Sequence, residues 1–176
     1  MLQYTNFRYC PKCGSTDILV HENNGMKCVA CNCYYFHNVA SATGAIIVSP
    51  SGILLVKRGH EPKKGLLDVP GGFVNYKESI EDALLREVKE ELDVDLPNMT
   101  YFGSFPNIYK YEKVTYFTTD AIFICKFDTV PVLKPNIEIA ESQWFERDEI
   151  PMDQFAFEST RTAFAKYLSK FIHQQP

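Results

Sequence analysis

Three glutamates near the middle of the chain, Glu87, Glu90 and Glu91, constrain this sequence more than any other feature. They end a run of about twenty residues, a usual length for a helix. Their spacings of three and four make their side chains neighbours on one helical face, where like charges repel. Hard cations such as Mg²⁺ or Mn²⁺ take oxygen ligands and bridge to phosphates, so the cluster predicts a metal site. The alternative interpretation is an ordinary solvated acidic face.

The same run has an apolar side that a helix can bury. This stripe lies roughly a quarter-turn from the glutamates, at about 100° per residue. It consists of Ile80, Leu84, Leu85, Val88 and Leu92. Ser79 followed by Asp82 predicts the start of the helix as a capping box, with Asp in place of the usual Glu. We therefore expect the helix to bury one side and to hold its acids at the edge of a cleft.

A longer pattern surrounds the glutamates. It consists of Gly72, Glu78, Arg86, Glu87, Val88, Glu90, Glu91, Asp93 and Val94. This string resembles the Nudix box, the signature of the Nudix hydrolases, and residues 61–72 are similar to the family's approach to the box. Leu67 stands where a Trp is common, and Asp93 stands where the family usually has Gly. Asp adopts the left-handed conformation with modest strain, so we expect Asp93 to be tolerated.

The Nudix resemblance implies both a fold class and an activity. The fold is α/β, with a mixed β-sheet sandwiched between helices. The activity is metal-dependent hydrolysis of a phosphoric anhydride bond in a nucleoside diphosphate that is linked to another group, as in NADH or ADP-ribose. Water attacks a phosphorus atom of the diphosphate, and Mg²⁺ or Mn²⁺ is the implied cofactor.

The resemblance also implies roles for the box residues. Glu87, Glu90 and Glu91 would be metal ligands, and either Glu90 or Glu91 would also take the proton from the attacking water. Gly72 can offer a backbone carbonyl to a metal because glycine allows close approach. Glu78, at the helix entrance, would be an outer metal contact or an orienting group.

Two further residues receive less direct assignments. Arg86 is expected to pair with a box carboxylate and fix the helix geometry, and the simpler interpretation is an i,i+4 pair with Glu90. The segment 138–145 resembles the one that precedes a late strand in the NADH pyrophosphatase branch. There the first Glu can join the metal site, which corresponds to Glu138; the alternative is an ordinary surface acid.

Five of the six cysteines lie in the first 33 residues. Four of them form two CxxC pairs separated by fourteen residues, Cys10, Cys13, Cys28 and Cys31. This spacing is typical of a four-thiolate structural zinc site, here in a zinc ribbon. A unit this short buries little apolar surface, so zinc would supply much of its folding energy. A redox CxxC is the alternative, but it usually has a βαβ context that is missing here; Cys33, His21 and His37 are not needed as ligands.

A zinc ribbon followed by a Nudix domain is similar to the NADH pyrophosphatases and their relatives. Those enzymes carry Ser-Gln-Pro-Trp-Pro-Phe-Pro downstream of the box. Residues 103–111 keep a Ser and a Pro but lack the Trp and the Pro-Phe-Pro run, so strict NADH preference is not expected. The candidates for stacking on a base are Phe105, Tyr109, Tyr111 and Tyr116. Aromatic residues in strands more often belong to the core.

We expect two domains, a zinc ribbon at residues 1–37 and a Nudix domain at 38–176. Strands are predicted at 42–48, 53–57, 71–74, 99–105, 115–127 and 139–145 from their β-branched and aromatic residues and the turn residues between them. A last helix is predicted at 159–172. Its apolar stripe would consist of Phe164, Tyr167, Leu168, Phe171 and Ile172.

Composition limits the partners. The net charge is -4, so no global basic field recruits nucleic acid. The sequence contains no apolar run of about eighteen residues, which a membrane span would need. The N-terminus lacks a signal-peptide pattern. We therefore expect a cytoplasmic protein with a small-molecule nucleotide substrate. The sequence leaves the oligomeric state open, a homodimer included.

Three functions are compatible with these patterns. The first is the metal-dependent diphosphate hydrolase; the second is a non-catalytic Nudix module that senses a nucleotide; the third is a zinc-ribbon protein that binds nucleic acid. The complete carboxylate set argues against the sensor, which has no need of acids that activate water. The acidic balance argues against the third, although Arg8, Lys12 and Lys27 give the ribbon some local positive charge.

Overall fold

The computed structural model describes residues 8–21, 25–112 and 114–172, with side chains up to residue 170. The chain divides into two compact units, Met1–Val39 and Ala40–Pro176, and each is described by itself. Within the described ranges, neither helix has the length and apolar character needed to cross a membrane.

The first unit contains a three-stranded antiparallel sheet in the order β1-β2-β3. The strands are β1 (Ile18–His21), β2 (Gly25–Cys28) and β3 (Tyr34–Phe36). Each CxxC pair is followed by a residue in the left-handed region, Gly14 with φ 73° and Asn32 with φ 55°. Glycine and asparagine tolerate this conformation. The chain can therefore turn sharply after each cysteine pair.

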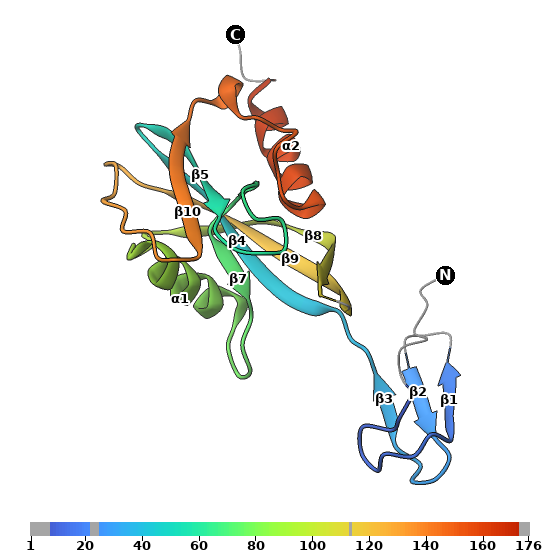
Figure 1. Cartoon of the computed structure of the whole chain (residues 1–176). Helices are drawn as coiled ribbons and strands as arrows, with labels where there is room; N and C mark the ends of the chain where they lie inside the picture. Colours follow the sequence, from blue (N-terminus) through green and yellow to red (C-terminus); the bar gives the residue numbers. More distant parts are fainter. Residues whose placement is uncertain (1–7, 22–24, 113, 173–176) are drawn as a thin grey trace. The chain divides into compact units, whose positions relative to one another are not determined.

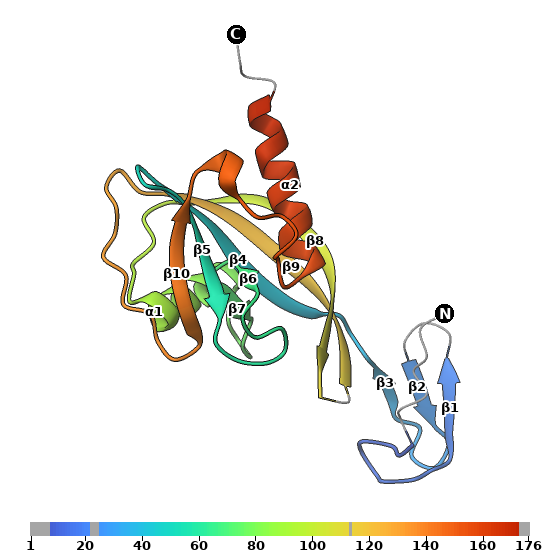
Figure 2. The same ribbon diagram turned by 45° about the horizontal axis from the view of Figure 1, so that its top comes forward.

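The second unit contains a mixed sheet in the order β10-β5-β4-β9-β8, with β6 paired to β5 and β7 paired to β4 (Figures 1 and 2). Its strands are β4 (Ala40–Ser49), β5 (Gly52–Arg58), β6 (Leu67–Asp68), β7 (Gly71–Phe73), β8 (Met99–Tyr111), β9 (Val114–Lys126) and β10 (Ile139–Phe145). Its helices are α1 (Ile80–Leu92), the short 3-10 turn Arg147–Glu149 and α2 (Glu158–Ile172). Strands β4 and β9 run parallel and the other pairs run antiparallel.

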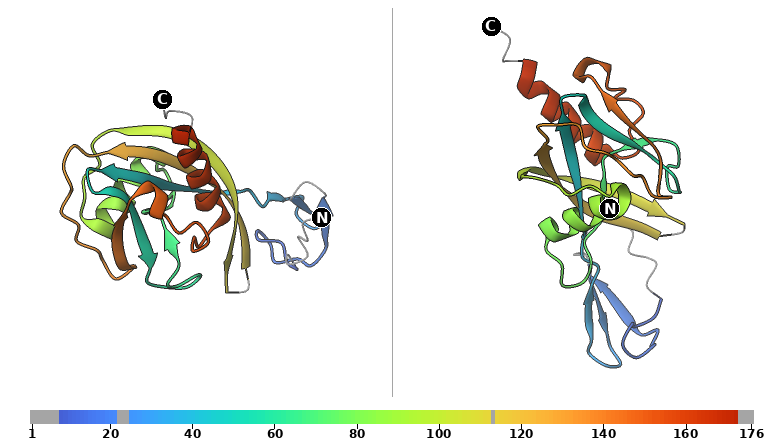
Figure 3. Two further views of the ribbon diagram at one scale, coloured as in Figure 1. Left: turned by 90° about the horizontal axis from the view of Figure 1, so that it is seen from above. Right: turned by 90° about the vertical axis from the view of Figure 1, so that its left-hand side faces the viewer.

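The two helices cover opposite faces of this sheet, which confirms the expected sandwich (Figures 1 and 2). On one face α1 buries Leu84, Val88 and Leu92 against a cluster that includes Ala45, Ile47, Leu54 and Phe123. On the other face α2 buries Phe164 and Tyr167 against a cluster that includes Ile46, Leu55, Phe102 and Phe105. Helix α2 contacts β8 along this face (Figure 3). Adjacent strand residues thus enter different cores because successive side chains point to opposite faces.

Strands β4 and β5 stay paired only near their connecting turn, from Ile47 opposite Leu54 to Ser49 opposite Gly52. Beyond that point residues 42–44 of β4 pair with β7 instead, so the two strands diverge. Residues 67–73 lie between the diverging strands, where β6 pairs with β5 and β7 pairs with β4. This divergence brings the glycines of the box next to the sheet, immediately before the chain enters α1.

Two local expectations differ from the structure. Strand β8 continues six residues past residue 105, through Pro106, to Tyr111; β8 is an edge strand, where a missing N–H is tolerated. Ile80 and Leu85 are exposed (36% and 39%), so the buried stripe of α1 is narrower than expected. The side chains of Phe171 and Ile172 lie outside the described residues.

Both ends of α1 follow from local chemistry. The hydroxyl of Ser79 accepts the N–H of Asp82 at 3.0 Å, as the capping-box pattern predicts. At the other end Asp93 has φ 54° and its N–H donates to the carbonyl of Lys89 at 3.0 Å. Hydrogen bonds from Lys134 and Lys89 lower the pKa of Asp93 to about 2. These ion pairs therefore contribute to the stability of the folded state at pH values above the ordinary carboxylate pKa. Their contribution is lost as the pH falls toward about 2.

Substitutions at Asp93 should separate backbone conformation from charge. Asp93→Gly keeps a residue that adopts positive φ freely and loses only exposed ion pairs, which contribute little. Asp93→Val places a β-branched residue in a conformation that it rarely adopts. We expect the thermal unfolding midpoint of the Gly variant to stay close to that of the wild type and that of the Val variant to fall clearly below both. Equal midpoints for the two variants would contradict the proposed role of the left-handed cap.

Candidate functional site

A cavity of about 360 Å³ lies where β4 and β5 diverge. It brings together most of the residues predicted to act on metal or substrate: Gly72, Arg86, Glu87, Glu90, Glu91, Tyr109 and Glu138. Glu78 does not line the cavity but contacts Arg86. The cavity therefore joins the box helix to residues of six strands, β4 to β9, and to the loop before β10.

Arg86 holds the acids of the box in place. Its Nε and Nη2 donate to the two carboxylate oxygens of Glu78 at 2.8 and 2.9 Å. Its Nη1 pairs with Glu87 at 2.9 Å and with Glu90 at 3.1 Å, and Nη2 also donates to the carbonyl of Phe73 at 3.1 Å. Such two-pronged contacts fix geometry as well as charge. The i,i+4 pair with Glu90 exists, but it is one contact among several.

Glu91 is the most deeply buried acid of the box, with 8% of its surface exposed. It accepts the N–H of Gly71 at 3.0 Å. Burial raises the pKa of Glu91 to about 8 against the effect of that hydrogen bond, and the nearby charges of Glu87, Asp68 and Glu138 raise it further. A buried carboxylate surrounded by other acids is unfavourable unless a proton or a cation accompanies it.

Glu87 is held in a similar environment. Burial is the main cause that raises its pKa, while Arg86 opposes the shift. A Cβ placed on Gly72 would lie 2.5 Å from the carboxylate of Glu87, so any larger residue there would push that carboxylate out of its present position. The close approach leaves the backbone of Gly72 beside the acids, where a carbonyl could serve as a further oxygen ligand.

This donor set fits a hard divalent cation. All the side-chain ligands are carboxylate oxygens, and their burial leaves negative charge for a cation to balance. Among the described residues, the acids of the cavity do not form a closed group whose ligand atoms all lie within 4.8 Å of one another. Mg²⁺ is commonly held in this open way, by one or two carboxylates together with substrate phosphates and water.

Three charged residues of the cavity were missed by the sequence analysis: Arg58, Asp68 and Asp120. Arg58 donates from Nε to the carbonyl of Pro62 at 2.8 Å, and its Nη1 lies 3.4 Å from Asp68. Burial raises the pKa of Asp68 to about 6, which the charge of Arg58 opposes. Asp68 directly precedes the Val-Pro-Gly-Gly approach to the box, which is the one signal that could have indicated it.

Aromatic residues form a second cavity of about 660 Å³, lined by Ala40, His60, Glu61, Phe73, Tyr109, Tyr111 and Tyr116. Three of these, His60, Phe73 and Tyr109, line both cavities. The ring of Tyr109 lies 5.3 Å from that of Phe73, 5.5 Å from that of Phe157 and 6.4 Å from that of Tyr116, between ring centroids. Tyr109 and Tyr116 are therefore placed where a planar ring could contact them.

Phe105 has a different environment from the one expected for a substrate contact. It is 6% exposed, belongs to the core under α2 and stacks on Phe102 with ring centroids 6.2 Å apart. Phe105, Asn107 and Tyr109 alternate along β8 and so share one face, but α2 covers that face at Phe105 and leaves it open at Tyr109. This placement favours a packing role for Phe105.

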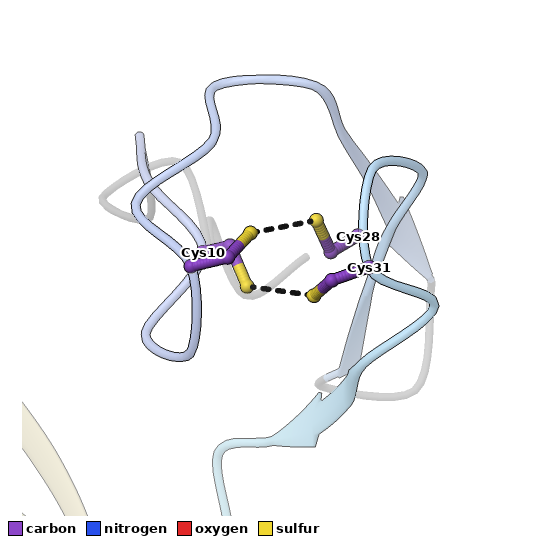
Figure 4. Close-up of side chains that lie close together, drawn as sticks. Cys10, Cys28 and Cys31 are labelled. Carbon is purple, nitrogen blue, oxygen red and sulfur yellow. Dashed lines mark hydrogen bonds between the residues drawn. The ribbon is translucent and has the colours of Figure 1, made fainter.

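The first unit brings four thiols together, those of Cys10, Cys13, Cys28 and Cys31 (Figure 4). Their sulfur atoms all lie within 4.8 Å of one another. Cys10 Sγ is 3.7 Å from Cys31 Sγ, and Cys13 Sγ is 3.6 Å from Cys28 Sγ. Burial acts to raise the pKa of Cys10, yet backbone hydrogen bonds from Cys13 and Lys12 lower it to about 6. A backbone hydrogen bond at Cys33 acts to lower the pKa of Cys31, but burial and hydrogen bonds with the neighbouring thiols raise it to about 12, so the four sulfur atoms become thiolates together only when a cation binds them. The group could hold one tetrahedral ion and includes neither histidine nor Cys33.

Comparison with known proteins connects this geometry to a family. The family model described as the NUDIX domain matches residues 39–166. The NAD-capped RNA hydrolase NudC of Vibrio vulnificus (strain CMCP6) is 30% identical over 145 residues, covering 82% of this chain and 52% of that protein. Its counterpart in Vibrio atlanticus (strain LGP32) is 29% identical over 147 residues, covering 83% and 52%. This chain thus spans about half the length of the curated relatives it matches.

Solved structures share the fold. A NUDIX hydrolase from Nitrosomonas europaea superposes with a TM-score of 0.72 at 23% identity, covering 97% of this chain and 95% of that chain. The NUDIX domain of Shewanella oneidensis NrtR, in complex with ADP ribose, has a TM-score of 0.63 at 17% identity, covering 79% and 91%. At these identities the likeness is one of fold.

Proposed function

This chain belongs to the Nudix family, and from that premise we propose that it is a metal-dependent pyrophosphohydrolase that cleaves the diphosphate of a nucleoside diphosphate linked to another group. The observation that carries the proposal is the cavity in which buried box acids face aromatic and polar side chains. The names of the Vibrio relatives refer to NAD-capped RNA, and one protein of the same fold was crystallised with ADP ribose. An NAD- or ADP-ribose-like substrate is consistent with both.

The cofactor in this proposal is Mg²⁺ or Mn²⁺. Glu87, Glu90 and Glu91 would hold it with the carbonyl of Gly72, and Glu138 would supply a further oxygen from the facing loop. When bound, the cation neutralises phosphate oxygens and lowers the pKa of a water molecule. The remaining chemistry falls to the side chains of the cavity.

The protein residues would position the substrate and remove a proton. Either Glu90 or Glu91 would accept the proton of the attacking water, a role that suits an acid at the edge of a phosphate site. Arg86 would keep Glu78, Glu87 and Glu90 aligned rather than touch the substrate, because these acids and a backbone carbonyl already engage its donors. Positioning and charge stabilisation account for most catalysis of this kind.

The proposal extends to the aromatic cavity and the first unit. Tyr109 and Tyr116 would stack on a planar part of the substrate, the base or the group beyond the diphosphate. Residues 1–37 would form a zinc ribbon in which zinc bound by Cys10, Cys13, Cys28 and Cys31 is structural, because four thiolates leave no open position. Residues 38–176 would form the hydrolase domain.

A substrate panel tests this function. We expect hydrolysis of several adenosine diphosphate derivatives with kcat/KM values within roughly a hundredfold of one another, the range typical of apolar contacts. The panel contains NADH, NAD, ADP-ribose, a diadenosine polyphosphate and a 5′-NAD-capped RNA, assayed under one metal condition with identification of both products. A preference above about 10⁴ for one compound would require polar side chains that form hydrogen bonds specific to that compound. If the protein hydrolyses none of these compounds, the result would contradict the hydrolase assignment and favour a nucleotide sensor.

A further inference from the structure

Asp120 is a buried carboxylate in the cavity that the proposed chemistry does not use. It lies on β9, is 9% exposed and lines the cavity. Its Oδ1 accepts the hydroxyl of Thr118 at 2.6 Å, and its Oδ2 accepts the hydroxyl of Ser159. In the part of the chain that the structure describes, no cation forms a salt bridge with it.

The chemistry of Asp120 indicates what kind of ligand group it can take. A carboxylate has about four acceptor positions, and two hydroxyl donors fill only two of them. Asp68 stands close enough for the charge of Asp120 to raise its pKa, and the nearby cation Arg58 pairs with Asp68. This end of the cavity is therefore rich in acceptors. A ligand that completes it must present hydrogen-bond donors, and two adjacent donors suit one carboxylate best.

The order of groups along the cavity indicates which part of a nucleotide lies there. Along β9, Ile122 lies opposite Gly44, which pairs with Gly71 beside Glu91, and Asp120 follows two residues earlier in the strand, opposite Ala42. Tyr116, which pairs with Tyr109, lies four residues further along in the same direction, so Asp120 stands between the box and Tyr109. Tyr109 lies on the far side, where the cavity meets the aromatic one. A nucleoside diphosphate has the same order: diphosphate, ribose, base. With its diphosphate at the box and its base at Tyr109, its ribose lies opposite Asp120.

We propose that Asp120 accepts hydrogen bonds from the cis-diol of the substrate ribose, with Asp68 as the neighbouring acceptor, and that the cavity thereby selects ribonucleotides over 2′-deoxyribonucleotides. The proposal rests on the proposed function, since it places a nucleoside diphosphate in the cavity. The diol presents two adjacent O–H donors, and acidic side chains bind ribose hydroxyls in this way in other nucleotide sites. The edge of adenine fits less well, because an acceptor nitrogen stands next to its amino group.

Binding of small nucleotides tests the proposal directly. The probes are ADP, 2′-deoxyADP and IDP, titrated calorimetrically into the full chain with Mg²⁺ present. An unsatisfied buried acceptor weakens binding by roughly tenfold or more, so we expect the wild type to bind ADP at least about tenfold more tightly than 2′-deoxyADP. ADP and IDP should bind within about threefold of each other. Asp120→Ala should bring the ADP to 2′-deoxyADP ratio to within about twofold.

Two matched variants separate recognition from anchoring of α2. Ser159→Ala removes the hydroxyl that ties Asp120 to α2 and leaves the carboxylate, so the ratio should persist. Asp120→Asn keeps the shape and loses the charge, and its ratio should fall between those of the wild type and Asp120→Ala. The proposal is overturned if the wild type binds ADP and 2′-deoxyADP equally, if it binds neither at millimolar concentration, or if Ser159→Ala removes the ratio as fully as Asp120→Ala does. A large preference for ADP over IDP would overturn it in favour of base recognition.

Hydrolysis of ADP-ribose, measured separately, distinguishes this inference from the function beneath it. Hydrolysis without ribose discrimination leaves the enzyme assignment intact and removes the role of Asp120. Discrimination in binding without hydrolysis of any substrate leaves the ribose site intact and removes the enzyme assignment.

Discussion

Replacing Glu91 by Gln is expected to lower kcat by about a thousandfold or more while the protein stays folded. The amide keeps the shape of the side chain but loses the charge that a divalent cation needs. Charge stabilisation by such a cation contributes several kcal/mol at the transition state, and each 1.36 kcal/mol corresponds to a factor of about ten in rate. Removal of Mg²⁺ and Mn²⁺ by a chelator should abolish activity in the wild type, and either ion should restore it.

Steady-state kinetics on the hydrolysed substrate measures this effect. Glu81→Gln is the matched control, because Glu81 is an exposed acid in the first turn of the same helix and does not line the cavity. Its activity should equal that of the wild type. Full activity of Glu91→Gln, or an equal loss in Glu81→Gln, would contradict the assignment.

The metal-free stability of the same variant gives an independent readout. The folded protein holds the proton of Glu91 up to a pKa of about 8, whereas an unfolded chain releases it near the ordinary value of 4.5. The folded state therefore binds more protons than the unfolded state between these values, and the free energy of unfolding falls as the pH rises through them. At pH 9 without metal, Glu91→Gln should unfold at a temperature equal to or above that of the wild type.

Replacing Cys28 by Ser is expected to empty the proposed zinc site and unfold the first unit. Zinc contributes roughly 10–16 kcal/mol to the folding of small four-ligand units at neutral pH, more than so small a core can replace. Cys28 is fully buried and shares its core with Cys10 and Met26. Elemental analysis should find about one zinc per wild-type chain and almost none in the variant. Limited proteolysis should then cut the variant within residues 1–39.

Cys33→Ser is the control for this prediction, because Cys33 packs against the core that contains Cys10 and Cys28 but lies outside the group of four thiols. It should keep its zinc and its resistance to proteolysis. Wild-type protein purified without chelator that contains no zinc would contradict the site, as would a loss of zinc from Cys33→Ser as complete as that from Cys28→Ser.

The sequence by itself was sufficient wherever the relevant contacts are local. The start of α1 at Ser79, its left-handed end at Asp93 and the proximity of the two cysteines within each CxxC pair follow from spacings of a few residues. Local patterns work here because a helix or a tight turn decides which side chains are neighbours before the rest of the fold forms. The box itself belongs to this class, since Glu87, Glu90 and Glu91 lie within two turns of one helix.

Only the tertiary structure decided what completes the cavity. Asp68, Asp120 and Arg58 come from three separate strands and meet because β4 and β5 diverge. Alternation along β8 places Phe105 and Tyr109 on one face, but it cannot tell which of them α2 covers, so one is core and the other lines the cavity. A period of two residues determines the face of a strand, whereas exposure depends on which distant element packs against that face.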